Sequence, residues 1–326
     1  MLGVSAIKLS EFFSICLHLV HESGKIIESV YKSKDFEKKM KGKDDPVTQA
    51  DIHVQTLLVK GLRHFYPKIH IVGEEDVEFK GELNYDFSKI NLSLIPNIYP
   101  SVKNEFPLED SIVWIDPLDG TLSYVDNELD AVTTLIGVSY KAQPIIGIVG
   151  HYFQSKGELF EYNPKIYFGH KQTKQVHYVY DHEIKPFLLG EGSLIPWELK
   201  AIPNPNIEKD FRIVCTKHRI DEVLEKRIKD LNGNPKLMGG CGKKIMQVIT
   251  GKSDCYFYDR KGTKKWDTCA CEALLLSLGG TLTTMNGDCY EYLPPPAEMN
   301  NNYGVLAMMD RGHHQKIIEI TKGFKV

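Results

Sequence analysis

Residues 114–121 read Trp-Ile-Asp-Pro-Leu-Asp-Gly-Thr. The apolar run 111–115 has the composition of a β-strand, so the two acids after it lie where a strand ends, and α/β proteins place their ligands there. The proline fixes one φ angle, and the glycine can adopt backbone angles closed to other residues. Such a turn can aim Asp116, Asp119 and a backbone carbonyl such as that of Leu118 at one point. Oxygen ligands grouped in this way suit a hard cation, Mg²⁺ above all.

The same stretch also has a purely structural interpretation. Pro-x-Asp-Gly is a common turn sequence, in which aspartate and glycine serve the backbone alone. Taken by itself, the stretch leaves a turn and a metal site about equally supported. Acidic residues elsewhere in the chain distinguish the two.

The composition is that of a soluble globular protein. The chain has 326 residues, 42% hydrophobic and 25% charged, enough for two domains or one large domain with a sizeable core. No apolar run reaches transmembrane length, and residues 1–10 do not resemble a signal peptide, so we expect no membrane partner. Seven cysteines without framework spacing indicate reduced thiols and a cytoplasmic protein. A net charge of −3 does not favour binding to a nucleic-acid polymer.

Apolar periodicity predicts the order of helices and strands. In the first half we expect helices at 8–33 and 48–65, strands at 68–72, 111–115, 131–140, 145–153 and 158–162, and an inserted loop at 77–110. In the second half we expect strands at 211–216, 254–258, 281–285 and 303–309, alternating with helices at 221–231, 243–250, 266–278 and 314–321. This order predicts an α/β protein with an α+β domain at 1–164 and an α/β domain at 165–326.

Three further acidic sites lie at boundaries of the predicted elements. Asp51 lies near the start of the second helix, Glu74 follows a short strand, and Asp267 opens a helix, where the helix dipole favours a negative charge. Each has a simpler explanation when taken alone: a surface helix residue, a solvated turn and a helix N-cap. All three share with residues 114–121 a position at the boundary of a predicted element.

Together these motifs resemble those of the lithium-sensitive, Mg²⁺-dependent phosphatases of the inositol monophosphatase superfamily. The motifs are D-P-V-T-Q-A-D at 45–51, G-E-E-D at 73–76, W-I-D-P-L-D-G-T at 114–121 and W-D-T-C-A-C-E-A at 266–273, with Gly279-Gly280 after them. The resemblance covers nearly the whole chain. It implies a layered α-β-α-β-α sandwich of the inositol monophosphatase and fructose-bisphosphatase type, with most metal ligands in the N-terminal domain and the substrate-binding loops in the C-terminal domain.

The resemblance also implies roles for individual residues. The implied ligands of two to three Mg²⁺ ions are Glu74, Asp116, the carbonyl of Leu118, Asp119 and Asp267. Asp51 and Thr121 are implied as the catalytic pair that orients and deprotonates the attacking water. Li⁺ is expected to inhibit. Two cations roughly 3.5–4 Å apart can clamp the attacking and leaving oxygens of an in-line displacement, so the implied roles agree with the chemistry.

Finer features resemble the bisphosphate 3′-nucleotidases and, next to them, the inositol polyphosphate 1-phosphatases. These features are Asp-Gly-Thr in the third motif and the loops 239–244 and 262–267. Such nucleotidases remove the 3′-phosphate of adenosine 3′,5′-bisphosphate and often accept inositol 1,4-bisphosphate. The implied substrate-binding residues are Gly120, Thr216, His218, Arg219, Gly240 and Lys244. One departure is that the nucleotidases usually read T-R-S-H where residues 216–219 read T-K-H-R, so Arg219 stands in the place of the usual histidine.

The sequence therefore predicts a phosphomonoesterase that binds a small phosphorylated substrate and cleaves it with metal-activated water. Two alternatives stay open. An inositol monophosphatase or a fructose-1,6-bisphosphatase-like enzyme would share the metal site, although the insertion 77–110 favours the bisphosphate branch. A cation-dependent module that senses phosphoinositides or nucleotides would need the metal ligands without the catalytic pair, and both members of that pair are present. No protein partner is indicated.

Overall fold

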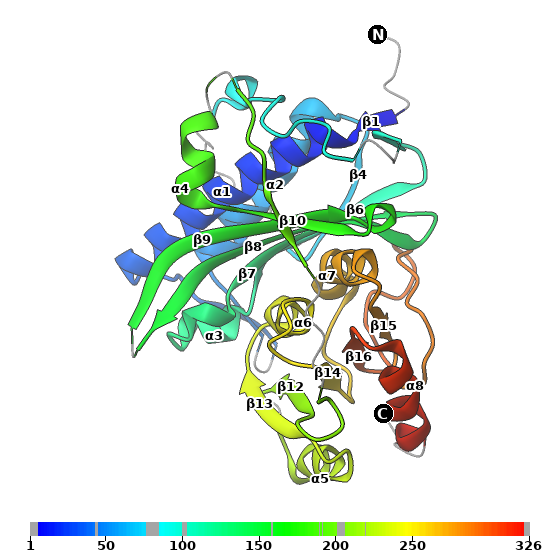
Figure 1. The fold of residues 1–326 in the computed structure, drawn as a ribbon. Coiled ribbons are helices and arrows are strands. Elements are labelled where there is room, and N and C mark those ends of the chain that lie inside the picture. Colours follow the sequence, from blue (N-terminus) through cyan, green and yellow to red (C-terminus); the bar gives the residue numbers. More distant parts are fainter. Residues whose placement is uncertain are drawn as a thin grey trace.

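A computed structural model describes residues 6–42, 45–75, 85–99, 103–157, 159–188, 190, 192–200, 206–218 and 220–322 of the chain. Two large sheets and three helical layers make up most of this part of the protein, together with two small two-stranded sheets (Figure 1). No helix within the described ranges is long and apolar enough to cross a membrane.

The larger sheet contains seven strands in the described part of the chain, in the order β11-β10-β9-β8-β7-β6-β4. Their bounds are β4 (His70–Gly73), β6 (Ser111–Asp119), β7 (Thr133–Tyr140), β8 (Gln143–Lys156), β9 (Leu159–His170), β10 (Gln175–Tyr180) and β11 (Trp197–Leu199). Neighbouring strands run antiparallel except β4 and β6, which are parallel and therefore end at the same edge. This shared edge brings the residues after β4 close to the end of β6.

Helices cover both faces of this sheet. On one face lie α1 (Leu9–Ser33) and α2 (Gln49–Phe65), which pack against each other (Figure 1). On the other lie α6 (Cys241–Ile249) and α7 (Lys265–Ser277). A side chain at Gly147 of β8 would lie 2.0 Å from the carbonyl oxygen of Ala270, so the glycine lets the backbone of α7 come close to the sheet. The N-terminus of α7 is thereby fixed near the end of β6.

The smaller sheet lies beyond α6 and α7. Within the described residues it has five strands in the order β13-β12-β14-β16-β15. The bounds are β12 (Arg212–Thr216), β13 (Asn234–Met238), β14 (Cys255–Tyr258), β15 (Thr281–Thr283) and β16 (Val305–Met308). Its outer face carries α5 (Glu222–Asp230) and α8 (Arg311–Thr321), which completes an α-β-α-β-α order of layers (Figure 1). The predicted fold class and layering are confirmed.

Short elements complete the fold around the site. β1 (Ala6–Lys8) pairs with β5 (Glu105–Pro107), and β2 (Lys39–Gly42) forms a hairpin with β3 (Asp45–Val47). Single-turn elements are η1 (Phe87–Lys89), α3 (Thr121–Val125), η2 (Leu129–Ala131), η3 (Lys171–Thr173), α4 (Asp181–Ile184) and η4 (Lys185–Phe187). Of the predicted insertion 77–110, residues 77–84 and 100–102 lie outside the described residues, and the rest contains η1 and β5.

Most predicted helices and strands agree with the structure to within a few residues, but β9 continues eight residues beyond the predicted strand 158–162. The strands β1, β2, β3, β5, β10, β11 and β13 were not predicted. β10, β11 and β13 lie at or near sheet edges, and β13 is exposed except for its last residue, so it lacks the apolar pattern of a buried strand. The predicted domain boundary between residues 164 and 165 falls inside β9. The larger sheet continues beyond β9 through β10 and β11 to Leu199. The first strand of the smaller sheet, β12, begins at Arg212. We therefore propose that the boundary between the two domains lies between Leu199 and Arg212.

Candidate active site

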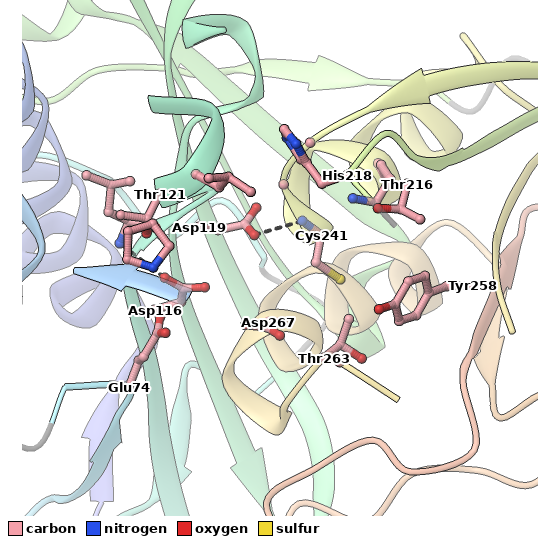
Figure 2. Close-up of a pocket in the computed structure, with 18 of the residues that line it drawn as sticks. Glu74, Asp116, Asp119, Thr121, Thr216, His218, Cys241, Tyr258, Thr263 and Asp267 are labelled. Atoms are coloured by element: carbon pink, nitrogen blue, oxygen red, sulfur yellow. Dashed lines mark hydrogen bonds between the residues drawn. The ribbon is translucent and has the colours of Figure 1, made fainter. Parts of the chain in front are cut away.

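A cavity opens between the two sheets, at the ends of β4 and β6 and at the N-termini of α6 and α7 (Figure 2). From the first half it is lined by Pro46, Glu74, Asp116, Leu118, Asp119, Gly120, Thr121 and Leu122. From the second half it is lined by Thr216, His218, Gly239, Gly240, Cys241, Lys244, Tyr256, Tyr258, Gly262, Thr263 and Asp267. The structure thus brings together all of the predicted site residues except Asp51, which lies behind Thr121, and Arg219, which lies outside the described residues.

Two glycines allow the halves to meet at this cavity. Gly120 has a φ of +90° and Gly240 a φ of +64°, in the region that favours glycine. A side chain on Gly240 would lie 2.4 Å from the carbonyl oxygen of Ala131, and one on Gly120 would lie 2.9 Å from the same atom. The loops after β6 and before α6 therefore close around one backbone carbonyl.

Asp119 connects the end of β6 to the start of α6. Its Oδ1 accepts a hydrogen bond from the backbone N–H of Cys241 at 2.7 Å (Figure 2), and its Oδ2 accepts one from that of Gly242 at 2.8 Å. The hydroxyl of Thr133 also donates to Oδ2, at 2.9 Å. Burial raises the pKa of Asp119, while the positive charge of Lys244 and these hydrogen bonds oppose the rise. The N–H groups of a helix N-terminus are favourable donors to a carboxylate.

Asp116 and Asp267 are the other two aspartates of the acidic cluster. The N–H of Leu118 donates to Oδ1 of Asp116 at 3.1 Å, and the N–H of Lys264 donates to Oδ2 of Asp267 at 2.7 Å. Burial raises the pKa of both carboxyls, with a further contribution from the charge of Glu74, and that of Asp267 reaches about 7. Buried like charges repel, so this cluster is stable in its ionised form only when cations neutralise it.

A lysine side chain of the protein partly neutralises the negative charge of the acidic cluster. Lys41 Nζ of the β2–β3 hairpin lies 3.0 Å from Oε1 of Glu74 and 2.6 Å from Oε1 of Glu75. Burial by itself would lower the pKa of Lys41, but the two glutamates reverse the effect and raise it. Glu74 therefore points toward an ammonium group that compensates its charge.

The donor set fits a hard cation, since it consists of carboxylates and one backbone carbonyl. Within the described ranges, however, no three His, Cys, Asp or Glu side chains are arranged so that they could hold a metal ion as they stand. Asp119 turns both oxygens toward donors, and Glu74 turns toward Lys41.

Asp51 and Thr121 form a hydrogen-bonded pair beside the cluster. The hydroxyl of Thr121 lies 3.0 Å from Oδ1 of Asp51 and 2.9 Å from the carbonyl oxygen of Leu118. Oδ2 of Asp51 accepts hydrogen bonds from the N–H and the hydroxyl of Thr48, at 2.8 and 2.6 Å, in a capping box at the start of α2. Burial raises the pKa of Asp51 to about 7, and the charges of Glu75 and Glu74 add to the rise. A carboxyl with a pKa near neutrality is suited to accept a proton.

The rest of the cavity is basic and aromatic. Lys244 is 5% exposed, and its Nζ lies 5.5 Å from the ring centre of Tyr256; burial lowers its pKa. His218 is held by Ser123, with 3.1 Å between Nε2 and the hydroxyl oxygen. Tyr256 and Tyr258 were not predicted as site residues, although their alternate positions on β14 (Cys255–Tyr258) place them on the same face of the sheet. The alternation of the two tyrosines along the strand could have predicted that both rings line the cavity.

Comparisons with known proteins agree with this fold and site. The chain belongs to the inositol monophosphatase family, whose model matches residues 8–323, and it is a phosphatase. It is 30% identical to a protein of Dictyostelium discoideum named 3′(2′),5′-bisphosphate nucleotidase 1, over 98% of both chains. It is 33% identical to the mouse protein of the same name, over 81% of this chain and 79% of the relative.

Solved structures confirm the architecture. The chain is similar to a staphylococcal inositol monophosphatase soaked in LiCl, with a TM-score of 0.66 at 15% identity, over 98% of this chain and 97% of the other. It is also similar to the extragenic suppressor protein suhB of Bartonella henselae, with a TM-score of 0.65 at 14% identity, over 96% of this chain and 99% of the other. At these identities the likeness concerns the fold alone.

Proposed function

We propose that this phosphatase is a Mg²⁺-dependent phosphomonoesterase that acts on small bisphosphates, namely adenosine 3′,5′-bisphosphate at its 3′-phosphate and inositol 1,4-bisphosphate at its 1-phosphate. One observation carries the proposal: the hydrogen bond of 3.0 Å between Thr121 and Asp51 lies beside a buried cluster of carboxylates. A cation-sensing module would need the cluster but has no use for a proton acceptor next to it.

The metal ligands of the proposal are Glu74, Asp116, the Leu118 carbonyl, Asp119 and Asp267, holding two to three ions. Bound Mg²⁺ supplies neutralisation of the substrate phosphate and activation of water at neutral pH. Asp51 accepts the hydroxyl hydrogen of Thr121, which leaves the lone pairs of Thr121 Oγ1 free to accept a hydrogen bond from the attacking water. The proton of that water then moves to Asp51 through the hydroxyl. Li⁺ is expected to inhibit.

The second phosphate of the substrate is assigned to the basic end of the cavity. Lys244 is the principal anchor, with Thr216 and His218 beside it, and the backbone at Gly120 and Gly240 leaves room for the ring. Arg219 stays a predicted contact. Tyr256 and Tyr258 offer aromatic surface to a base or a sugar ring. The names of the relatives in Dictyostelium and mouse support a nucleotide bisphosphate.

Steady-state kcat/KM on four phosphate esters tests the proposal: the two bisphosphates, inositol 1-phosphate and fructose 1,6-bisphosphate. With Mg²⁺ both proposed substrates should be hydrolysed, inositol 1-phosphate should be poor because it lacks the second phosphate, and EDTA should abolish turnover. A preference for inositol 1-phosphate in direct competition, or turnover that survives EDTA, would contradict the proposal.

A cytoplasmic location forms part of the same proposal. All seven cysteines, each within the described residues, are free thiols, as expected in a reducing compartment.

A further inference from the structure

Thr263 lines the cavity close to Asp267 and has no assigned role (Figure 2). It is 5% exposed, so almost no water reaches it outside the cavity. Its oxygen accepts a hydrogen bond from the side-chain amide of Asn301, with 3.2 Å between Oγ1 and Nδ2. In the part of the chain that the structure describes, no residue accepts the hydroxyl hydrogen of Thr263.

Asn301 is completely buried and comes from the segment before β16. Its Nδ2 lies 2.9 Å from the carbonyl oxygen of Lys264 and 3.3 Å from the hydroxyl of Thr268, besides the contact with Thr263. Because a carbonyl can only accept, these contacts identify the nitrogen of the amide. The other atom, Oδ1, has no hydrogen-bond partner among the described residues. A buried unpaired acceptor is unfavourable, so the Nδ2 contacts outweigh that cost.

Backbone hydrogen bonds also connect the segment around Asn301 to the segment around Thr263. The N–H of Asn301 donates to the carbonyl of Thr263 at 2.8 Å, and the N–H of Lys265 donates to the carbonyl of Met299 at 2.9 Å. Residues 299–301 therefore pair with residues 263–265, the segment that leads into α7. The N–H of Lys264 in this segment is the one that donates to Asp267. The orientation of Thr263 is thus fixed from outside the cavity wall.

A buried network supports this arrangement from the other side. The hydroxyl of Tyr292 donates its one hydrogen to Glu272, and its oxygen lies 3.1 Å from Thr268 Oγ1. The hydroxyls of Thr268 and Tyr292 are both buried in this network. The amide of Asn301 has two hydrogens. The carbonyl of Lys264 takes one at 2.9 Å, and of the two remaining contacts the one with Thr263 is the shorter, at 3.2 Å against 3.3 Å for Thr268.

From these contacts we propose that Thr263 is a substrate-binding residue, whose hydroxyl donates a hydrogen bond to an oxygen of the bound phosphorylated substrate. Asn301 is the positioning residue that occupies the acceptor side of that hydroxyl and so directs its hydrogen into the cavity. The inference rests on the proposed function only in that a phosphorylated small molecule occupies the cavity.

Kinetics of Thr263→Val, Thr263→Ser, Asn301→Ala and the double variant Thr263→Val/Asn301→Ala test this. A hydrogen bond to a charged oxygen corresponds to roughly a tenfold effect or more. Thr263→Val should therefore raise KM for adenosine 3′,5′-bisphosphate by about this factor with little change in kcat, and Thr263→Ser should stay close to wild type. Asn301→Ala should raise KM in the same direction. The double variant should be no worse than Thr263→Val alone, since Asn301 acts through the hydroxyl.

Two matched controls separate binding from stability. Asn300→Ala removes the neighbouring exposed amide, which contacts Glu298, and should leave KM unchanged. Thr321→Val removes a buried hydroxyl from α8, far from the cavity in sequence and fold, and should lower the melting temperature without changing KM. A second readout is the rise in melting temperature caused by inorganic phosphate with Mg²⁺, which should be smaller in Thr263→Val than in Thr321→Val.

A wild-type KM in Thr263→Val would overturn the inference, as would equal phosphate stabilisation in Thr263→Val and Thr321→Val. If the increases in KM caused by the two single substitutions multiply in the double variant, Asn301 does not act through Thr263 and its positioning role is contradicted. If the wild type prefers inositol 1-phosphate, the proposed substrate fails, and the same KM comparison made on that ester still decides the role of Thr263.

Discussion

Replacing Asp51 with asparagine should separate catalysis from stability. Thr48 donates two hydrogen bonds to Oδ2 of Asp51, so an asparagine must place its oxygen there and its amide nitrogen toward Thr121. The amide then donates to Thr121 instead of accepting from it, and it cannot take up a proton. The hydroxyl of Thr121 has the carbonyl of Leu118 as an alternative acceptor, 2.9 Å away. General-base assistance contributes about 10²–10⁴-fold, so kcat should fall by that order.

Although it lowers kcat, Asp51→Asn should raise the free energy of unfolding. The pKa of Asp51 rises from 3.8 to about 7 because the carboxyl is buried near other acids. A carboxyl with a raised pKa gives its full stabilisation below pH 3.8 and loses it as the pH rises through about 7. At 1.36 kcal/mol per pH unit, ionisation costs up to about 4 kcal/mol at pH 8 without Mg²⁺. Asp51→Asn avoids this cost, so it should be more stable than wild type at pH 8 and gain less than half as much at pH 5.

Two assays check the prediction: phosphate release at saturating Mg²⁺, and urea unfolding followed by circular dichroism at pH 5 and pH 8 without Mg²⁺. Asp310→Asn is a matched control, because Asp310 caps α8 in a similar way, by accepting from the N–H of His313 at 2.7 Å. That variant should keep its kcat and show no comparable gain at pH 8. A kcat of Asp51→Asn within twofold of wild type would refute the catalytic assignment. A variant that loses activity and stability together would show a structural role only.

Further predictions concern the ions, the second phosphate and the backbone. Glu74→Gln should raise the Mg²⁺ concentration for half-maximal activity at least about tenfold, since it removes a charged ligand, and unchanged Mg²⁺ dependence would exclude Glu74 as a ligand. Without Mg²⁺, the melting temperature should fall between pH 5 and pH 8, because burial raises the pKa of Asp267 to about 7, and millimolar Mg²⁺ should restore it at pH 8; a rise with pH would contradict the electrostatic account. Lys244→Met should raise KM for both bisphosphates far more than for inositol 1-phosphate, and equal effects on all three esters would show that the lysine does not hold the second phosphate. Gly240→Ala should lower the free energy of unfolding by roughly 1–3 kcal/mol, because its side chain would lie 2.4 Å from a carbonyl oxygen, and wild-type stability in urea unfolding would refute this.

The sequence alone determined the order of elements and the composition of the acidic site. Helices such as α1 and α2 have apolar residues at three- and four-residue steps, which is a property of the helix itself and needs no knowledge of the partner surface. Asp116 and Asp119 lie in the last part of β6, Glu74 follows β4, and Asp51 and Asp267 lie at helix starts, so their place toward element ends could be inferred from local signals. The family resemblance then supplied roles that local signals cannot supply.

Tertiary structure decided which of these ends meet. Asp119 and Cys241 are 122 positions apart, and their 2.7 Å contact depends on two glycines that close around the carbonyl of Ala131. The pairing of Lys41 with Glu74 and the positioning of Thr263 by Asn301 are of the same kind. No periodicity or composition records a contact between distant segments, because it arises only when the faces of two layers are packed together. For the same reason exposed β13 escaped prediction, since its place comes from hydrogen bonds to β12 and not from a buried apolar pattern.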